Sequence, residues 1–445
     1  METFFQKGIT AKKFTRFVTP SVIMLVFMAM YTVIDSIFVA NVIGADALAA
    51  VNIVYPICGI GWGISVMLAS GSSAIVAIKM GEGKEREANE KFSLICITSI
   101  ILGILFVGIS LGFAEGIISL LGSTEKLWEY CMDYGVVILL GIPAVFLGVL
   151  LEYFIRIDGK PGFVLFLYVL GGIVNIILDY VFLVHLGWGI AGAAWATVAG
   201  QYTVMIVGMV YFITQKTKLK FALPKMDLRF IRNSMVNGSS EMVSESSVAI
   251  TQILFNLIAL GLAGEGGVAA LSIVLNTHYL LISIHLGFIT GVAPLISYYY
   301  GAMDPKKVNV CLYYCKKFMW VASIGVATLA LFGAPLIAKI FVEDNSEVYF
   351  IAVRGIRFLS VAFLFTGINI FASGFFTAYA NGKISAIISL SRGLVMILIG
   401  ASILPLFFGM DGIWLAIIFA EVMTFGLSLF VLNKYRNRYR YDFSL

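Results

Sequence analysis

The sequence predicts an all-α polytopic membrane protein, with twelve transmembrane helices arranged in two lobes of six. The first observation is composition: 60% of the 445 residues are hydrophobic and only 12% are charged, whereas about 25% of residues are charged in a soluble domain. The second is the length of the apolar stretches, which reach 20 residues or more where a barrel strand needs about 10 of alternating polarity. The third is an internal repeat that divides the chain in half.

Twelve apolar stretches are long enough to cross a bilayer as helices, and several are long enough to tilt. They cover residues 15–42, 48–79, 92–121, 131–155, 162–186, 190–214, 235–262, 268–300, 318–341, 350–378, 384–407 and 412–433. Basic residues precede the first stretch, but no small-residue cleavage site follows it. We therefore expect the first span to stay in the mature protein rather than to be removed as a signal peptide.

The loops between the spans alternate between basic and acidic or neutral. Lysines and arginines gather in residues 79–91, 156–160, 216–232, 306–317 and 434–440. The positive-inside rule predicts a multi-pass protein of the cell (cytoplasmic) membrane with both termini in the cytoplasm. The longest basic loop separates an N-terminal lobe (1–214) from a C-terminal lobe (235–445), with 215–234 as a cytoplasmic inter-lobe loop.

The two halves repeat at a nearly constant offset. A shift of 220 residues lays Gly71 on Gly291 and Gly81 on Gly301, and a shift of 223 lays Gly189 on Gly412. A duplication of an even number of spans gives both copies the same orientation. The lobes should therefore be related by a pseudo-two-fold along the membrane normal, with a cleft between them.

Several function classes lack their motifs in this sequence. No Gly-rich loop ends in Gly-Lys-Ser or Gly-Lys-Thr, and no HExxH, GxGD or Ser–His arrangement of an intramembrane hydrolase is found. The five scattered cysteines form no metal-type pair and are expected to be free thiols. We expect a transporter driven by ion gradients, not an enzyme, with no cofactor, no metal and no nucleic-acid partner.

Two acids lie inside the apolar spans of the N-terminal half. Asp179 follows Asn175 by four residues, so both occupy one face of the fifth span. Asp35 lies in the first span, and both acids fall roughly 10–12 Å below the outer surface at about 1.5 Å per residue. Carboxylates are costly in hydrocarbon and repel each other, which favours proton uptake. We predict that Asp35, Asn175 and Asp179 share a cation-coupling pocket.

Glu241 and Glu245 occupy one face of the seventh span, one turn apart. Acids just after a helix start offset the backbone dipole, which gives Glu241 an alternative, structural explanation. Glu245 lies deeper in the span. Both are candidates for contact with a cationic substrate or ion.

The remaining intramembrane charges are predicted to form structural ion pairs. Glu152 and Arg156 have the i,i+4 spacing that favours a pair on one helix, and Arg392 and Glu421 have opposite signs in adjacent spans. His278 and His285 share a face of the eighth span, where packing or cavity lining is favoured over metal binding. Pro20 removes a backbone hydrogen bond within the first span and permits a helix bend.

These motifs resemble the multidrug and toxic-compound extrusion (MATE) transporters, nearest the MepA-like bacterial branch. The resemblance covers essentially the whole chain and rests on residues 33–39, 48–51, 156–159 and 175–179. It implies that Asp35, Asn175 and Asp179 form the cation-coupling cluster, with Asp158 as a nearby acidic position and Pro20 as the bend. The sodium-linked Glu and Asp of the NorM-type branch are not matched, because residues 360–378 contain no acid and Glu241 and Glu245 have another spacing.

The sequence therefore predicts a monomeric, cation-coupled antiporter that exports amphipathic, mostly cationic organic compounds by alternating access across the lipid bilayer. Protons are favoured as the coupling ion, with sodium as the alternative. A flippase for lipid-linked oligosaccharides is a second alternative. It should have a cationic cavity, but Arg392 is the only deep base.

Overall fold

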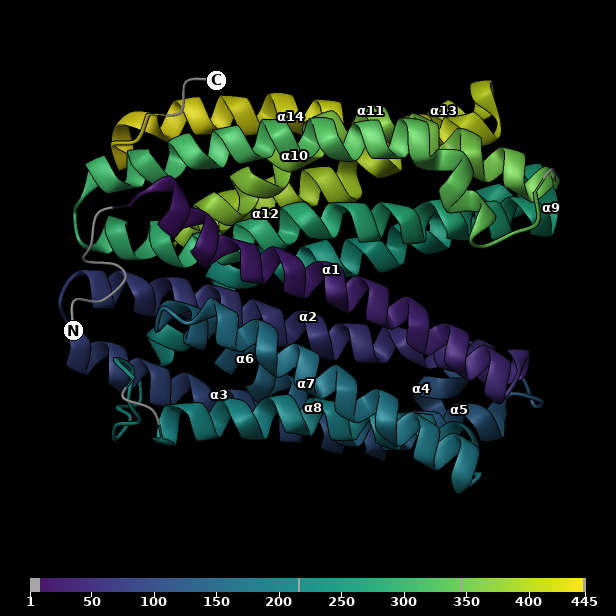
Figure 1. Ribbon diagram of the computed structural model, residues 1–445, viewed down its shortest axis with the longest axis horizontal. Helices are drawn as coiled ribbons and strands as arrows, with labels where there is room; N and C mark the ends of the chain where they lie inside the picture. Colours follow the sequence, from purple (N-terminus) through teal and green to yellow (C-terminus); the bar gives the residue numbers. More distant parts are fainter. Residues whose placement is uncertain (1–8, 215–216, 345, 443–445) are drawn as a thin grey trace.

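The computed structural model describes residues 9–214, 217–344 and 346–442, except for the side chains of residues 33–41 and 45. All regular secondary structure in these ranges is helical, and most helices run along the long axis of the molecule (Figure 1). The elements are α1 (Ala11–Val42), α2 (Ala45–Gly81), α3 (Glu85–Gly112), α4 (Ala114–Leu120), α5 (Trp128–Leu140), α6 (Ile142–Ile157), α7 (Pro161–Asp179), η1 (Tyr180–His185), α8 (Gly189–Thr214), α9 (Leu228–Gly301), α10 (Pro305–Lys339), α11 (Glu347–Ala378), α12 (Gly382–Leu390), η2 (Ser391–Val395), α13 (Met396–Phe408) and α14 (Met410–Tyr439).

The described helices supply the twelve predicted spans. Ten stretches are long and apolar enough to cross a membrane, and α5 with α6, bent by 43°, gives one more. The last comes from α9, which is interrupted at Ala263 and Gly264, where Gly264 has φ 61° and ψ −154°. A residue with a Cβ adopts this φ with strain, so glycine permits the chain to reverse between two spans. The all-α, twelve-span prediction is confirmed.

The spans form two lobes related by a pseudo-two-fold along the helix direction. One lobe contains α2 to α8 and the other contains most of α9 to α14, as Figure 1 shows. Each lobe has its own apolar core: α2, α3, α6, α7 and α8 contribute to one, and α9, α10, α11, α13 and α14 to the other. The lobes lie side by side, so the cleft between them runs along the helices.

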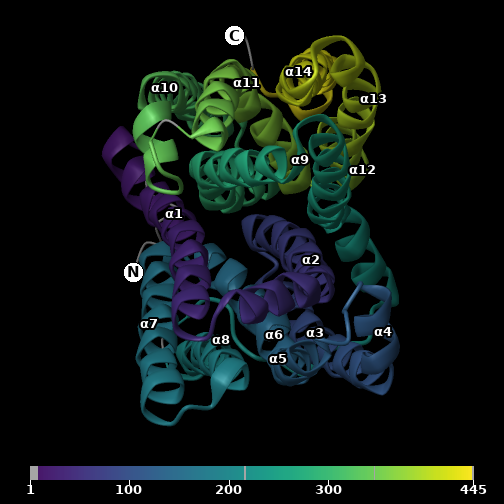
Figure 2. The ribbon, with the colours of Figure 1, turned by 90° about the vertical axis from the view of Figure 1, so that its right-hand side faces the viewer.

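Two helices cross from one lobe to the other, which the sequence did not predict. The first turns of α1 place Phe14 and Phe17 in the core of the C-terminal lobe, whereas Met24 packs in the N-terminal core. In the same way, Phe230 at the start of α9 packs in the N-terminal core. Figure 2 shows these two crossings on opposite sides of the molecule. The lobes therefore exchange the first part of their first helices.

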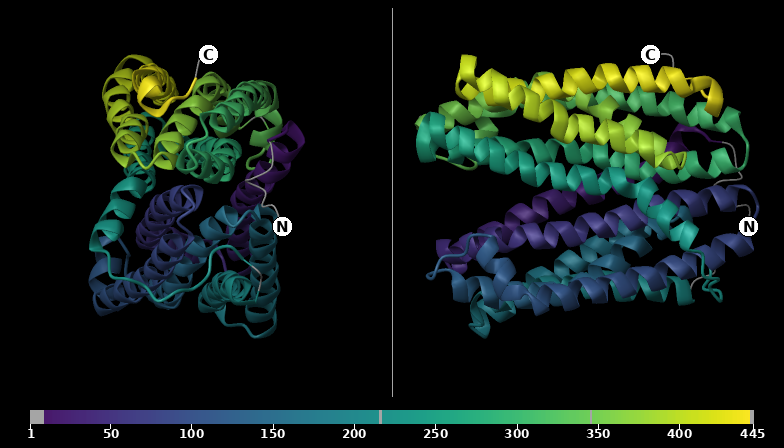
Figure 3. Two further views of the ribbon diagram at one scale, coloured as in Figure 1. Left: turned by 90° about the vertical axis from the view of Figure 1, so that its left-hand side faces the viewer. Right: turned by 180° about the vertical axis from the view of Figure 1, so that it is seen from behind.

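The two ends of the molecule differ in charge. The turns 82–84, 158–160, 302–304 and 379–381 lie at one end, together with the inter-lobe loop and the end of α14. Figure 3 shows the start of α1 and the end of α14 at this same end. The lysines and arginines of the predicted basic loops are in these segments. We call it the basic end and the opposite one the far end.

The cleft narrows toward the basic end. No residue of α2 between 61 and 80 is exposed, and none of α9 between 281 and 301. Nearer the far end the same two helices carry exposed side chains, with Tyr55 64% and Tyr279 54% exposed. The lobes are in contact at the basic end and separate toward the far end.

Candidate functional site

The N-terminal lobe buries a polar cluster around Asn175 and Asp179. These residues lie one turn apart on α7 and are 1% and 4% exposed. The hydroxyl of Tyr31 on α1 donates to Oδ1 of Asn175 at 2.5 Å. Nδ2 of Asn175 donates to the hydroxyl of Thr197 on α8 at 3.4 Å. The amide therefore joins three helices.

Small residues bring α8 onto this face of α7. A Cβ added to Gly200 would lie 3.3 Å from Cβ of Asn175 and 2.9 Å from the carbonyl oxygen of Gly171. Directly after Asp179 the α-helix changes to the wider π-helical turn η1. Such turns inside α-helices occur frequently at functional sites. The close packing of α8 on α7 positions the amide of Asn175, and the wider turn η1 directly follows Asp179.

The side chain of Asp35 lies outside the described residues, and its backbone belongs to α1. It follows Tyr31 by four residues, so both occupy one face of α1. Tyr31 contacts Asn175, so α1 reaches the predicted cluster at Tyr31. Sequence reasoning missed Tyr31, although the four-residue spacing to Asp35 was a usable signal. It also missed Thr197, for which the sequence gives no signal.

Asp158 lies at the basic end, not beside the other predicted cluster residues. The 19 residues of α7 separate it from Asp179 by roughly 28 Å at about 1.5 Å per residue. Its Oδ2 accepts from the hydroxyl of Tyr211 at 2.6 Å, and its Oδ1 accepts from the backbone N–H of Lys218 at 2.7 Å. Burial raises the pKa of its carboxyl, against the effect of these hydrogen bonds. Asp158 fastens the inter-lobe loop to the N-terminal lobe.

Glu152 and Arg156 form a buried ion pair on α6, with Nη1 of Arg156 2.9 Å from Oε1 of Glu152. Arg156 is 0% exposed. It also donates to the hydroxyl of Ser21 on α1 at 3.3 Å. Pro20, the neighbour of Ser21, lies inside the continuous helix α1, and its role as a bend stays a prediction. The pair connects α6 to the helix that crosses between the lobes.

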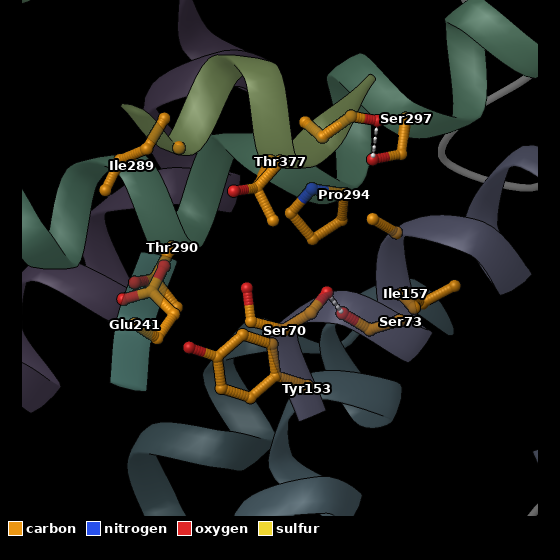
Figure 4. A pocket seen from close by; sticks show the side chains of 14 residues that line it. Ser70, Ser73, Tyr153, Ile157, Glu241, Ile289, Thr290, Pro294, Ser297 and Thr377 are labelled. Carbon is orange, nitrogen blue, oxygen red and sulfur yellow. Dashed lines mark hydrogen bonds between the residues drawn. The ribbon is translucent and has the colours of Figure 1, made fainter. Parts of the chain in front are cut away.

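Glu241 faces a pocket between the lobes. The space free of protein atoms in the pocket, including the part that is open to solvent, is about 440 Å³. Figure 4 shows Glu241 and Thr290 close together, with Tyr153 and Ser70 beside them. Its lining comes from both lobes: Ser70, Ser73, Ala74, Tyr153 and Ile157 from α2 and α6, and Glu241, Ile289, Thr290, Ala293, Pro294, Ser297, Gly374, Thr377 and Ala378 from α9 and α11. The pocket therefore combines one carboxylate with several hydroxyl groups.

Glu245 lies one turn further along α9 and is exposed. A Cβ added to Gly63 of α2 would lie 3.4 Å from the Cβ of Glu245. Tyr55 of α2 and Tyr279 of α9 both interact electrostatically with its carboxylate. A carboxylate with aromatic rings from both lobes is a suitable environment for an organic cation.

The C-terminal lobe holds a second polar network. Nε of Arg392 lies 2.9 Å from Oε1 of Glu421. Nδ2 of Asn369 donates to the other carboxylate oxygen, Oε2, at 2.7 Å, and Ser428 donates to Oδ1 of Asn369 at 3.0 Å. Sequence reasoning missed Asn369 and Ser428. Both carboxylate oxygens of Glu421 have partners inside the protein.

The two histidines of the eighth predicted span have packing contacts. The ring of His278 stacks on Phe363 with centroids 5.5 Å apart, and Nε2 of His285 lies 3.2 Å from the hydroxyl of Ser323. In the described part of the chain, no three His, Cys, Asp or Glu side chains are grouped as ligands for a metal ion.

The fold of two helical lobes agrees with the comparison to known proteins. The family model MatE matches residues 20–181 and 242–401, which is most of both lobes. The chain belongs to the MATE family. Members of this family are transporters rather than enzymes, and MATE transporters need no cofactor.

Curated relatives of this MATE protein include two staphylococcal proteins named "Multidrug export protein MepA". The one from Staphylococcus haemolyticus is 22% identical over 442 residues, covering 99% of this chain and 97% of the relative. The one from Staphylococcus aureus strain NCTC 8325 is 21% identical over 449 residues, with the same coverage. Both relatives align along nearly their whole length.

Solved structures show the same fold. A MATE structure in complex with MaL6 has a TM-score of 0.93 at 22% identity, covering 98% of each chain. A MATE transporter in an outward-facing conformation has a TM-score of 0.90 at 23% identity, covering 96% of each chain. The MATE transporter described here thus shares the two-lobe architecture of these neighbours.

Proposed function

We propose that this MATE transporter is an antiporter of the cell membrane that couples cation entry to the export of amphipathic, mostly cationic organic compounds. The observation that carries the proposal is the position of its acids. Asn175 and Asp179 are buried within one lobe, whereas Glu241 and Glu245 face the cleft between the lobes. Separate sites allow a coupling ion and a substrate to affect the same lobe movement.

The basic end is the cytoplasmic end in this proposal, as the positive-inside rule requires, so both termini are cytoplasmic. The far end then opens to the outside. Asp35 and Asp179 load a cation from outside, the substrate leaves, and the lobes reorient before the cation is discharged inside. The transporter acts as a monomer.

Protons are the favoured coupling ion, because a poorly hydrated carboxylate gains stability by taking one up. Sodium remains the alternative, since the same oxygens are hard ligands. The names of the MepA relatives support multidrug export. A lipid-linked oligosaccharide flippase is disfavoured, because Arg392 is paired with Glu421 and does not supply a free cationic group to the cleft.

The test is proton release from acidified inside-out vesicles when ethidium is added. We expect the wild type to dissipate the pH gradient and Asp35→Asn and Asp179→Asn to lose this response at matched expression. A gradient that ethidium leaves untouched, together with sodium-driven ethidium movement, would identify sodium as the coupling ion. Coupling to neither ion would contradict the antiporter proposal and favour the flippase.

A further inference from the structure

At the basic end, α2 and α9 approach each other so closely that their backbones touch at glycines. A Cβ added to Gly71 of α2 would collide with the carbonyl oxygen of Ser234 on α9. A Cβ added to Gly238 of α9 would collide with the carbonyl oxygen of Met67 on α2. These glycines have ordinary helical backbones, so their need for a small residue comes from the close approach of the neighbouring helix, the start of α9 at Gly71 and α2 at Gly238.

The repeat places one such contact near the local symmetry axis. Gly81 ends α2, and Gly301, its equivalent 220 residues later, ends α9. A Cβ on Gly81 would meet the backbone of residues 298–302, and a Cβ on Gly301 would meet the backbone of Ile78. The two equivalent glycines therefore pack against each other's helices.

On the other side of the symmetry axis, the second segment of α9 packs closely against α1. Gly287 of α9 lies against the backbone of Ser21 and Val22 on α1, with a carbonyl oxygen 2.8 Å from an added Cβ. Gly291, the repeat equivalent of Gly71, lies 3.1 Å by the same measure from the side chain of Ser21. Thus α2 packs on the first segment of α9, and α1 packs on the second segment.

Asn237 adds a polar link between the lobes. It is 3% exposed. Its Nδ2 donates to the carbonyl oxygen of Gly71 in one lobe at 3.2 Å, and to that of Thr377 in the other at 3.0 Å. The same amide thus bridges α2 and α11 beside a glycine contact.

We propose that these glycines and Asn237 form the cytoplasmic gate of the transporter and set the balance between its outward-open and inward-open states. The inference relies on the orientation given under the proposed function. The pocket of Glu241 lies next to this gate, since Ser70, Ser73 and Thr377 line it beside Gly71 and Asn237. The pocket reaches the cytoplasm when these contacts separate.

The gate consists of contacts between lobes, so substitutions in it affect the closed state selectively. An added methyl group in a tight contact is destabilising, and here it opposes closure without altering either lobe's own core. A ligand or mutation shifts a two-state equilibrium only through its differential effect on the two states. The gate glycines therefore control how often the cytoplasmic side opens, without binding substrate.

The experiment uses a reporter cysteine, Ser73→Cys, in a variant whose five native cysteines are replaced. A membrane-impermeant maleimide is added to inside-out vesicles, so it approaches from the cytoplasmic side. We expect Gly81→Ala and Gly301→Ala to raise the labelling rate by about fivefold or more. Gly108→Ala is the matched control, because it adds the same methyl where nothing lies within 4 Å, and its rate should equal that of the parent.

Unchanged or slower labelling in correctly folded Gly81→Ala and Gly301→Ala would overturn the gate. Folding is checked by monodispersity and thermal unfolding of the purified variants. If they do not fold, Asn237→Ala tests the same gate by removing the two inter-lobe hydrogen bonds, and faster labelling is again expected. Labelling requires no transport, so the gate can stand when the antiporter assay fails, and the reverse.

Discussion

The hydroxyl of Tyr31 donates a 2.5 Å hydrogen bond to Oδ1 of Asn175, joining α1 to α7. Asp35 follows Tyr31 by one turn on α1, and Asp179 follows Asn175 by one turn on α7. The bond therefore links the two helices that carry the proposed coupling acids. A cation bound by one acid can affect the other helix through this contact.

Tyr31→Phe tests this connection while keeping the aromatic ring. The change leaves Oδ1 of Asn175 without its donor, a loss worth about 1–3 kcal/mol for a buried group. We expect ethidium-driven proton release to fall several-fold, measured in inside-out vesicles. Tyr313→Phe is the control, because Tyr313 is 59% exposed on α10. Wild-type coupling in Tyr31→Phe would show that the bond has no part in the cycle.

The Arg392 and Glu421 pair should behave as a buried ion pair in stability measurements. Breaking such a pair by removing one partner costs about 3–5 kcal/mol, whereas replacing both partners is often nearly neutral. We expect Glu421→Gln to lower the thermal unfolding temperature strongly, and the double variant Arg392→Met with Glu421→Gln to recover most of the loss. Arg354→Met, which breaks an ion pair with Arg354 65% exposed, should cost less than about 1 kcal/mol. A double variant as unstable as Glu421→Gln would contradict this account.

Hydropathy and charge patterns predicted the spans and the lobes because the bilayer imposes length and polarity on every segment. Charged residues in the spans were also visible from the sequence. Arg392 needs a nearby opposite charge in hydrocarbon, and Glu421 in the adjacent span was the available one. The predicted partners indeed lie 2.9 Å apart.

Neutral polar partners were not predictable in the same way. Asn369 on α11 donates to Glu421 on α14 from 52 positions away, and no rule of spacing connects residues so far apart. Ser428 lies two turns after Glu421 on α14 and donates to Asn369. The crossing of α1 from one lobe to the other could not be predicted for a related reason. Phe14 and Phe17 are apolar in either lobe, so the pattern specifies burial but not the neighbour.

Asp158 provides a pH-dependent prediction at the basic end. Burial raises the pKa of its carboxyl in the folded protein above the unfolded value of 3.8. The folded state therefore binds a proton at Asp158 more tightly than the unfolded state does. The stability that this proton contributes is lost as the pH rises through the folded pKa. We expect the stability of the wild type relative to Asp158→Asn to fall as the pH is raised above about 4, measured by thermal unfolding of the purified protein.

The hydrogen bonds of Asp158 predict a second difference at neutral pH. Asp158→Ala leaves the hydroxyl of Tyr211 and the N–H of Lys218 without their acceptor, so it should be less stable than Asp158→Asn by about 1–3 kcal/mol. Asn keeps one oxygen for the backbone donor. Equal stability of the two variants would mean that the loop is held by its other contacts, such as the 2.8 Å bond from the N–H of Ala222 to Ser93.

The cleft acids should differ from the N-lobe cluster in what they bind. Glu245 is exposed and interacts electrostatically with Tyr55 and Tyr279, so an organic cation bound there gains both a carboxylate and aromatic faces. We expect Glu245→Gln to weaken ethidium binding to the purified protein by about tenfold, a loss near 1.4 kcal/mol. Tyr55→Ala should weaken it less.

The matched control for this measurement is Glu265→Gln, which removes an exposed carboxylate at the break of α9. The ethidium affinity of Glu265→Gln should equal that of the wild type, because this variant loses one negative charge but keeps Glu245, Tyr55 and Tyr279. Asp179→Asn should also bind ethidium normally while failing to couple protons. If Glu245→Gln binds as the wild type does and Asp179→Asn does not, the substrate occupies the N-terminal lobe, and the assignment of substrate and ion sites is reversed.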